Sequence, residues 1–147
     1  RLLQGKIHSH NHEYGRATDE FRTAQEMFSE SLPAGNSLVM QAKVAFGTAL
    51  IRSGNLTGGE SQLREARSIV TGSLRSGDPL IAEIDSVLGE CLTAKRQFAE
   101  AEELLLNSIE LQQAQSSNNG PPVSETRHRL KTLYQVWNRP IDAQKYD

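Results

Sequence analysis

Two stretches of 21 residues decide the fold: FGTALIRSGNLTGGESQLREA at 46–66 and LGECLTAKRQFAEAEELLLNS at 88–108. They carry the same order of large and small residues, 42 positions apart, beginning with Phe46-Gly47 in one and Leu88-Gly89 in the other. Other columns at this period hold small residues (Ala17, Gly59, Ala101 and Ala143; Ala24, Ala66 and Ser108) or apolar ones (Phe46, Leu88 and Leu130; Leu50, Leu92 and Tyr134; Phe21, Leu63 and Leu105; Met27, Ile69 and Leu111). A fixed period of this length is the signature of a repeat architecture.

Each repeat predicts two amphipathic helices. Apolar residues recur at spacings of three and four over 38–50, and again over 60–74, which is the one-sided stripe of a helix. Pro79, preceded by Asp78, and Pro121 mark later helix starts, because proline loses no hydrogen bond in a first turn. No stretch alternates apolar and polar residues for long enough to indicate a strand. The predicted fold class is all-α.

The small columns predict where the helices approach one another closely. Gly47 and Gly89 fall inside predicted helices, where glycine costs about 1 kcal/mol relative to alanine. Close packing can offset that cost, and a short helix pair buries its stripe only by stacking on its neighbours. The 147 residues hold about 3.5 repeats, with expected boundaries at 1–36 (partial), 37–78, 79–120 and 121–147 (partial). We therefore expect a single array that is a fragment of a longer chain.

These columns resemble the tetratricopeptide repeat (TPR). The family pattern of large and small positions is matched by Leu88, Gly89, Leu92, Ala101, Leu105 and Ser108, and by Phe46, Gly47, Leu50, Gly59, Leu63 and Ala66 in the repeat before. The 42-residue length is similar to that in kinesin light chains and many bacterial proteins. The resemblance implies a right-handed α-solenoid of antiparallel helix pairs. It departs from the family where Lys43, Asp85 and Arg127 replace an aromatic residue, and where Gln4 and His8 occupy apolar places.

The same resemblance implies a protein-interaction function. In this family the first helix of each pair, helix A, lines a concave groove that presents side chains to a peptide or a partner protein. The groove positions carried over to this sequence are Gln41, Val44, Thr48, Ile51 and Arg52, then Glu83, Ser86, Glu90 and Thr93, and finally His128, Thr132 and Gln135. Thr48 and Glu90 replace the asparagine of peptide-carboxylate clamps. A partner with positive or apolar character is therefore the expectation.

Two other interpretations stay open. The stretch 130–146 is similar to the last repeat in tails of bacterial serine/threonine protein kinases, although no kinase signature occurs in these residues. The chain could thus be the regulatory tail of a kinase whose catalytic domain lies elsewhere. Alternatively, the apolar faces at the ends of the array, near Leu133, Trp137 and Tyr146, could make it a self-associating structural segment.

Charge and composition exclude several other classes. The formal net charge of −2 is spread along the chain, whereas nucleic-acid binding needs clustered Lys and Arg. No stretch approaches the ~18 apolar residues of a spanning helix, and the residues after Arg1 lack the order of a signal peptide. We therefore expect no nucleic-acid or membrane partner. The compartment stays open, with the cytoplasm favoured.

The candidates for catalytic or metal chemistry are weak. His8 and His12 share a face of a helix while His10 points away, so a three-ligand metal site is not expected and the two histidines are a weak candidate only. Cys91 lies in an apolar column and is predicted to be a core residue. Ser124 is expected to cap a helix rather than to act as a nucleophile. We expect no enzymatic activity and no cofactor in these residues.

Overall fold

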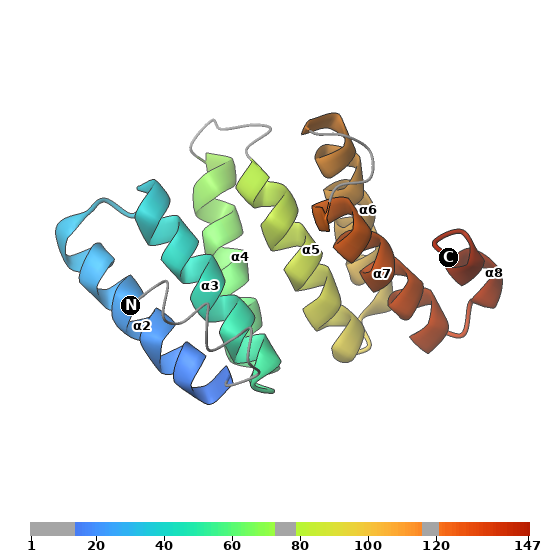
Figure 1. Ribbon diagram of the computed structural model, residues 1–147, viewed down its shortest axis with the longest axis horizontal. Coiled ribbons are helices and arrows are strands. Elements are labelled where there is room, and N and C mark those ends of the chain that lie inside the picture. The colour runs from blue at the N-terminus through green and yellow to red at the C-terminus, as the bar shows by residue number, and fades with distance from the viewer. Residues whose placement is uncertain (1–13, 73–78, 116–120) are drawn as a thin grey trace. The chain divides into compact units, whose positions relative to one another are not determined.

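The computed structural model describes residues 14–72, 79–115 and 121–147, and the part it describes is helical without strands. Its helices are α2 (Tyr14–Ser31), α3 (Ser37–Arg52), α4 (Leu56–Gly72), α5 (Pro79–Ala94), α6 (Phe98–Gln115), α7 (Pro121–Val136) and α8 (Pro140–Gln144), shown in Figure 1. The all-α prediction is confirmed.

The helix starts repeat with the period of the sequence. The first helices of the pairs, α3, α5 and α7, begin at Ser37, Pro79 and Pro121. The second helices, helices B, are α2, α4, α6 and α8, and they begin at residues 14, 56, 98 and 140. Each start lies 42 residues after its predecessor. The second helix of the repeat at 37–78 was expected at 60–74, but α4 begins four residues earlier, at Leu56.

The turns within the pairs repeat as well, because each is the same helix-ending motif. Gly54, Arg96 and Asn138 occupy equivalent positions with φ values of 95°, 62° and 60°. After each of them an N–H returns to a carbonyl five residues back, from Asn55 to Leu50 (2.8 Å), from Gln97 to Leu92 (2.9 Å) and from Arg139 to Tyr134 (2.7 Å). This is the Schellman pattern that satisfies the last carbonyls of a helix. Three-residue turns of this kind make each helix pair antiparallel (Figure 1).

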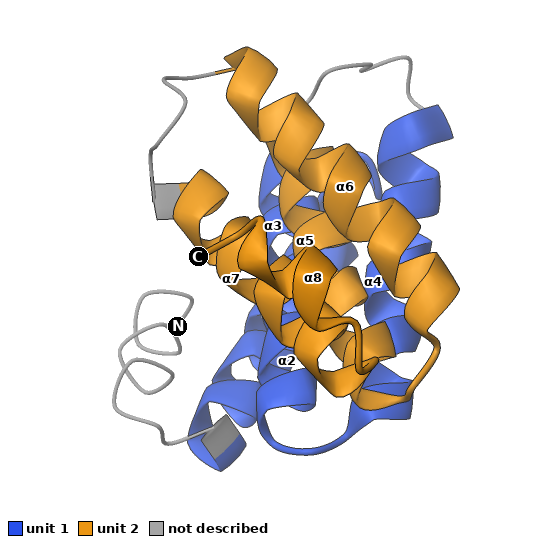
Figure 2. Ribbon diagram, turned by 90° about the vertical axis from the view of Figure 1, so that its right-hand side faces the viewer, with its two compact units in different colours: residues 1–74 blue, residues 75–147 orange. Residues whose placement is uncertain are grey.

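The chain divides into two compact units, residues 1–74 and residues 75–147, coloured separately in Figure 2. In the N-terminal unit α3 packs against both α2 and α4. Its core contains Ala17, Phe21, Phe46, Ala49 and Leu50. In the C-terminal unit α5 packs on α6, while α7 contacts α5, α6 and α8. Leu88, Leu92, Leu105, Leu130 and Leu133 are fully buried there. Each unit therefore has an apolar core of its own.

The close approach of helices that the sequence predicted at Gly47 and Gly89 is confirmed. A Cβ added at Gly89 would lie 2.5 Å from Leu105 Cγ, and one added at Gly47 would lie 3.1 Å from Leu63 Cγ. Leu63 and Leu105 are both fully buried in helix B of their own repeat. Because glycine has no side chain, the two helices of each pair can approach until the leucine packs on the glycine backbone.

Three of the four apolar columns are buried, and one is not. The cores contain three columns: Phe46, Leu88 and Leu130; Leu50, Leu92 and Tyr134; and Phe21, Leu63 and Leu105. Met27 instead has 55% of its surface exposed, and its equivalents Ile69 and Leu111 are half-buried. This column therefore follows the apolar stripe toward the solvent-facing side of helix B.

Candidate functional site

The predicted groove positions on α3 differ in their access to solvent. Gln41 is exposed, and Thr48 and Arg52 are half-buried. Val44 and Ile51 are buried, and the hydroxyl of Thr48 donates to the carbonyl of Val44 at 2.8 Å. In the N-terminal unit a partner could thus reach Gln41 and parts of Thr48 and Arg52, but not the two apolar positions.

The predicted positions on α5 and α7 divide in the same way, and all of them belong to the C-terminal unit. Three are exposed (Glu83, His128 and Gln135), two are half-buried (Glu90 and Thr132) and two are buried (Ser86 and Thr93). Thr93 donates its hydroxyl hydrogen to the carbonyl of Gly89 at 2.8 Å, so its polar group is used inside the helix. Ser86 and Glu90 take part in a larger cluster.

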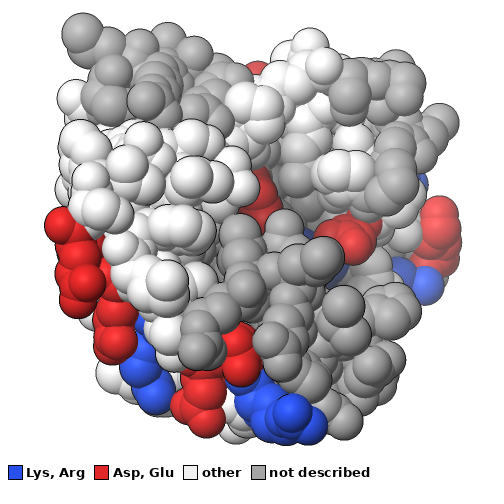
Figure 3. Space-filling view, turned by 60° about the vertical axis from the view of Figure 1, so that its left-hand side comes forward, with Lys and Arg blue, Asp and Glu red and all other residues white. Residues whose placement is uncertain are grey.

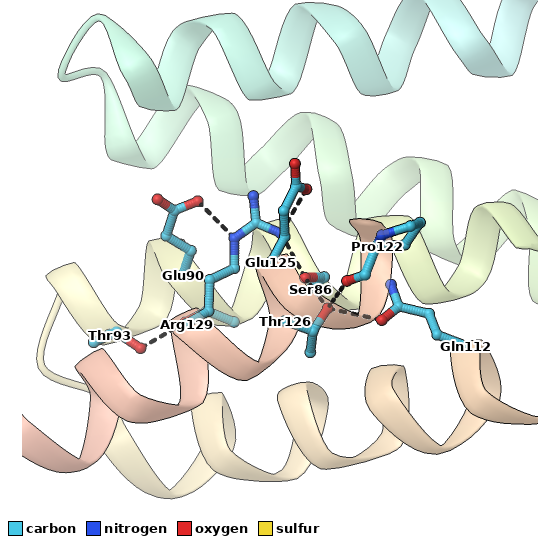
Figure 4. Close-up of polar contacts among 9 residues, drawn as sticks. Ser86, Glu90, Thr93, Gln112, Pro122, Glu125, Thr126 and Arg129 are labelled. Atoms are coloured by element: carbon cyan, nitrogen blue, oxygen red, sulfur yellow. Dashed lines mark hydrogen bonds and ion pairs between the residues drawn. The ribbon is translucent and has the colours of Figure 1, made fainter. Parts of the chain in front are cut away.

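Arg129 of α7 is the centre of that cluster, shown in Figure 4. Its Nε lies 3.2 Å from the carboxylate of Glu90 on α5, and its Nη1 lies 2.6 Å from the hydroxyl of Ser86. Nη1 is also 3.9 Å from the carboxylate of Glu125, one turn earlier on α7. Only 15% of the Arg129 side chain is exposed. The guanidinium therefore holds α5 and α7 together through charged and hydrogen-bonded contacts.

The network continues inward from Ser86. The hydroxyl of Thr126 lies 2.8 Å from Ser86 Oγ and donates to Gln112 Oε1 at 2.8 Å. The carbonyl of Pro122, at 3.1 Å, is a second and more distant acceptor for the one hydroxyl hydrogen of Thr126. With that hydrogen given to either acceptor, Ser86 is the donor to Thr126 and the acceptor from Arg129. The result is a directed chain from Arg129 through Ser86 and Thr126 to Gln112, which joins α7, α5 and α6. We call these four residues the polar network.

Sequence reasoning missed Arg129, Thr126 and Gln112, although a signal for them exists. Every member of the polar network replaces an apolar residue of the preceding repeat. The equivalents of Ser86, Gln112, Thr126 and Arg129 are Val44, Val70, Ile84 and Val87. Four apolar columns that each change to a polar residue in the same part of the chain indicate a buried polar network. The sequence does not show which of these four side chains pair with one another.

The surface above the network is acidic. Glu83 and Glu125 are exposed and Glu90 is half-buried, and Arg129 lies beside the carboxylates of Glu90 and Glu125. We call the exposed parts of Glu83, Glu90, Glu125 and His128 the α5–α7 surface.

Acidic and basic side chains also form pairs at other places on the described surface. On the face drawn in Figure 3, Lys and Arg lie beside Asp and Glu. Arg64 and Glu60 pair at 2.7 Å and Arg22 and Asp19 at 3.2 Å, each within one helix of the N-terminal unit. Exposed pairs of this type contribute little stability.

The residues that replace the expected aromatic side chain form contacts between the helices of a pair. Lys43 is buried and lies 3.2 Å from the carboxylate of Glu65 on α4. Asp85, one repeat later, is fully buried and accepts a hydrogen bond at 2.8 Å from the amide of Asn107 on α6. Both partners lie 22 residues further on, so a polar contact recurs at the period of the repeat.

The residues predicted to form an apolar, self-associating end face make contacts inside the C-terminal unit. Leu133 is fully buried, the ring of Trp137 stacks on Phe98 with centroids 5.5 Å apart, and Tyr146 stacks on Tyr134 at 6.0 Å. Leu133 is therefore not part of an exposed apolar end face, whereas Trp137 and Tyr146 are half-buried and self-association stays a prediction. The sequence places them in apolar columns but does not show which neighbour covers them.

Tyr134 is the polar centre of this aromatic stack. Its hydroxyl donates to the carboxylate of Glu102 on α6 at 2.7 Å, and the guanidinium of Arg139 lies over both Tyr134 and Trp137. Burial, and then the hydrogen bond to Glu102, raise the pKa of Tyr134 above its ordinary range. The phenol is therefore neutral and stays a donor at physiological pH.

The other candidates for chemistry have structural positions or lie outside the described residues. Cys91 is fully buried, as expected. Ser124 was expected to cap a helix, but α7 begins three residues earlier at Pro121, so that prediction was wrong. His8 and His12 lie outside the described residues, and the cap at Asp78 does too. Within the described ranges no group of three His, Cys, Asp or Glu side chains is placed to hold a metal ion, and no helix there is long and apolar enough to cross a membrane.

Comparisons with known proteins identify the fold. No family model and no curated protein matches the sequence. Among solved structures, a Podosopora anserina protein described as a putative kinesin light chain with nearly identical TPR-like repeats has a TM-score of 0.85 at 18% identity, over 99% of this chain and 69% of that one. A structure of a single-substitution variant with the same description gives 0.84 at 17% identity, with 99% and 68% covered. BtubC (BKLC) from P. vanneervenii gives 0.80 at 14%, with 99% and 58% covered.

These likenesses agree with the repeated helix starts, the repeated turns and the glycine–leucine contacts. At identities below one fifth they establish the fold and leave the ligand open. The chain has the fold of a TPR-like helical repeat of the α-solenoid class.

Proposed function

We propose that the chain is a non-catalytic protein-interaction module, and that its α5–α7 surface binds a basic segment of a partner protein. TPR-like repeats generally mediate protein–protein interaction, which supports the general class. The observation that supports the finer proposal is the position of two carboxylates, Glu90 and Glu125, beside the guanidinium of Arg129 on a surface that also carries the exposed Glu83. A Lys or Arg side chain of a partner complements these carboxylates.

Arg129 also gives this surface a fixed geometry. Its contacts with Glu90 and Ser86 hold the α5 and α7 side chains in place before a partner arrives. A preformed surface loses less conformational entropy on binding than a flexible one. Glu83 and Glu125 are exposed, whereas Glu90 is half-buried and lies against Arg129. The contributions of Gln41, Thr48 and Arg52 on α3, and the relation to kinase tails, remain predictions from the sequence.

The test is a selection of peptides followed by a charge reversal. Short random peptides displayed on phage are selected on the whole chain, and we expect enrichment in Lys and Arg. The tightest peptide is then labelled, and its affinity is measured by fluorescence anisotropy. Glu83→Lys with Glu125→Lys should weaken binding about tenfold or more, and added salt should weaken binding to the original chain.

Glu103→Lys with Glu110→Lys on α6 is the matched control, because it reverses the same number of exposed charges on helix B. Equal binding by both double variants, or no enrichment in basic residues, would contradict the proposal. Light scattering of the same samples over a concentration series addresses the competing self-association hypothesis. Concentration-dependent mass that neither variant changes would favour assembly over peptide display.

A further inference from the structure

A pocket in the N-terminal unit shares no residue with the α5–α7 surface. It has a volume of about 150 Å³ and lies between α2, α3, α4 and the turn that joins α2 to α3. Leu32, Val39 and Ile69 give it apolar walls. Lys43 and Glu65 also line it, with 3.2 Å between Nζ and Oε2. The pocket therefore combines apolar side chains with an ion pair.

The size of the pocket fits a single six-membered ring. A cavity of about 150 Å³ with apolar walls is large enough to hold benzene, whereas drug-sized ligands occupy pockets of about 300 Å³ or more. Val39 is buried, and Leu32 and Ile69 are half-buried, so part of the apolar wall is in contact with water. A ring that enters the pocket removes this apolar area from water, which is favourable.

The ion pair determines which polar group the ring carries. Only 8% of the Lys43 side chain is exposed, whereas 59% of the Glu65 side chain is exposed. An ammonium group can donate several hydrogen bonds and a carboxylate can accept several, so one contact leaves both groups with capacity for a ligand. A hydrocarbon would remove the pair from water without compensation, and an ion of either sign would be repelled by one member of the pair. A neutral hydroxyl group can accept from Lys43 and donate to Glu65.

The C-terminal unit already contains this combination with a phenol. The hydroxyl of Tyr134 donates to the carboxylate of Glu102 at 2.7 Å, and the same carboxylate oxygen lies 3.7 Å from Nη1 of Arg139. The guanidinium of Arg139 also lies over the ring of Tyr134, with 5.6 Å between Cζ and the ring centroid. A carboxylate that is paired with a cation therefore accepts a phenol in this protein, while the cation contacts the ring. Lys43 and Glu65 present the same two partners at the pocket.

We propose that this pocket binds a phenolic ring, and we call it the phenol pocket. The ring packs on Leu32, Val39 and Ile69, and its hydroxyl group donates to Glu65 and accepts from Lys43. The ring belongs either to a small free phenol or to a tyrosine side chain, and the experiment below distinguishes these two sources. Because the phenol pocket and the α5–α7 surface have no residue in common, the two proposals fail independently.

The probe is 4-methylphenol, which is neutral at about pH 7. Its binding to the whole chain, labelled with ¹⁵N, is followed by NMR through the amide signals of the residues around the pocket. We expect saturable binding with a dissociation constant of about 1 mM or lower. Toluene has the same ring and methyl group without the hydroxyl, and it should bind at least about fivefold more weakly.

Two variants of the chain test the position of the ligand. Lys43→Met keeps the length of the side chain and removes the ammonium group, so it should reduce the preference for 4-methylphenol over toluene. Because Lys43 is buried, the second variant changes an exposed residue: Ser29→Trp fills the pocket from the surface of α2 and should weaken binding about tenfold. Glu30→Trp is the matched control, because Glu30 is the next residue, is exposed and does not line the pocket.

N-acetyltyrosinamide separates the two sources of the phenol. Binding as tight as that of 4-methylphenol would assign the pocket to a tyrosine side chain, and binding of 4-methylphenol alone would assign it to a free phenol; both results support the proposal. No saturable binding of 4-methylphenol up to about 10 mM would overturn it. Equal affinity for 4-methylphenol and toluene, or equal loss of binding in Ser29→Trp and Glu30→Trp, would overturn it as well.

Discussion

Gly89 shows how one residue without a side chain sets the distance between two helices. Leu105 is fully buried against it, and an added Cβ would lie 2.5 Å from Leu105 Cγ and 2.7 Å from Cδ2. Contacts that short force the leucine or the helix to move. The helix propensity that alanine gains, about 1 kcal/mol, is smaller than the strain of overpacking, typically about 1–3 kcal/mol.

We therefore predict that Gly89→Ala lowers the free energy of unfolding by up to about 2 kcal/mol, measured by urea unfolding. Gly15→Ala is the comparison, because no atom lies within 4 Å of its added Cβ. That variant should be neutral or slightly more stable. A Gly89→Ala protein as stable as the original would mean that Leu105 has another rotamer available.

From the raised pKa of Tyr134 we predict that the protein loses stability in alkaline solution. Its pKa in the folded protein is raised above the ordinary 10.0, chiefly by burial. The phenol therefore loses its proton at a lower pH in the unfolded chain than in the folded one. The contribution of Tyr134 to the free energy of unfolding is fully present below the unfolded pKa of about 10, and it is lost as the pH rises toward the folded pKa. At about pH 11 the loss from this one group amounts to about 1 kcal/mol.

The measurement is urea unfolding at about pH 8 and about pH 11, on either side of the unfolded pKa, followed by Trp137 fluorescence, for the original chain and for Tyr134→Phe. The variant loses a hydrogen bond at both pH values, but it should show the smaller drop between them. Identical drops would place the alkaline sensitivity in other groups.

At the scale of the elements, α5, α6 and α7 are joined by a buried polar network where the preceding repeat has apolar residues. Substituting one residue of the network and substituting all four should have different effects on the free energy of unfolding. Thr126→Val leaves Ser86 and Gln112 without their hydroxyl partner in a buried position and should cost about 1–3 kcal/mol.

Replacing all four residues by their equivalents gives Ser86→Val, Gln112→Val, Thr126→Ile and Arg129→Val. This variant should be about as stable as the original or more stable, because apolar groups remove the desolvation penalty of the network. Both variants are compared by thermal and urea unfolding. A fourfold variant that is less stable than Thr126→Val would show that the network contributes net stability.

The fourfold variant also separates stability from binding. It removes Arg129, which positions the carboxylates of Glu90 and Glu125. Under the proposed function it should keep its fold and bind basic peptides with altered affinity.

At the scale of the whole molecule, the chain consists of two units with separate apolar cores. The sequence contains one tryptophan, Trp137, which lies in the C-terminal unit. Its fluorescence therefore reports on that unit, whereas circular dichroism reports on the helices of both. In repeat proteins stability is close to a sum of local terms.

We predict that Gly59→Ala in the N-terminal unit, whose added Cβ would lie 2.7 Å from the carbonyl oxygen of Gly47, lowers the midpoint seen by circular dichroism. It should move the Trp137 transition less than Gly89→Ala does. Equal shifts of the Trp137 midpoint by both variants would mean that the two units unfold together.

Much of the order of the helices could be predicted from the sequence, because it depends on interactions between residues that are close together in the chain. The 42-residue period, the prolines at the helix starts and the glycine columns predicted the helix pairs and their closest contacts. The three turns share a positive φ, at Gly54, Arg96 and Asn138, although only the first of these is a glycine. The expectation of a single array, and the groove positions that are exposed, remain predictions.

The sequence by itself determined the period, the helix class and the large–small packing columns, since these depend on residues a few positions apart on one helix face. Only the tertiary structure decided how Arg129, Ser86, Thr126 and Gln112 connect, and which rings Trp137 and Tyr146 stack on. Pairing between side chains 14 to 43 residues apart depends on the distance and angle between helices. A hydrophobic pattern fixes which face of a helix is buried, but it does not specify which partner buries that face.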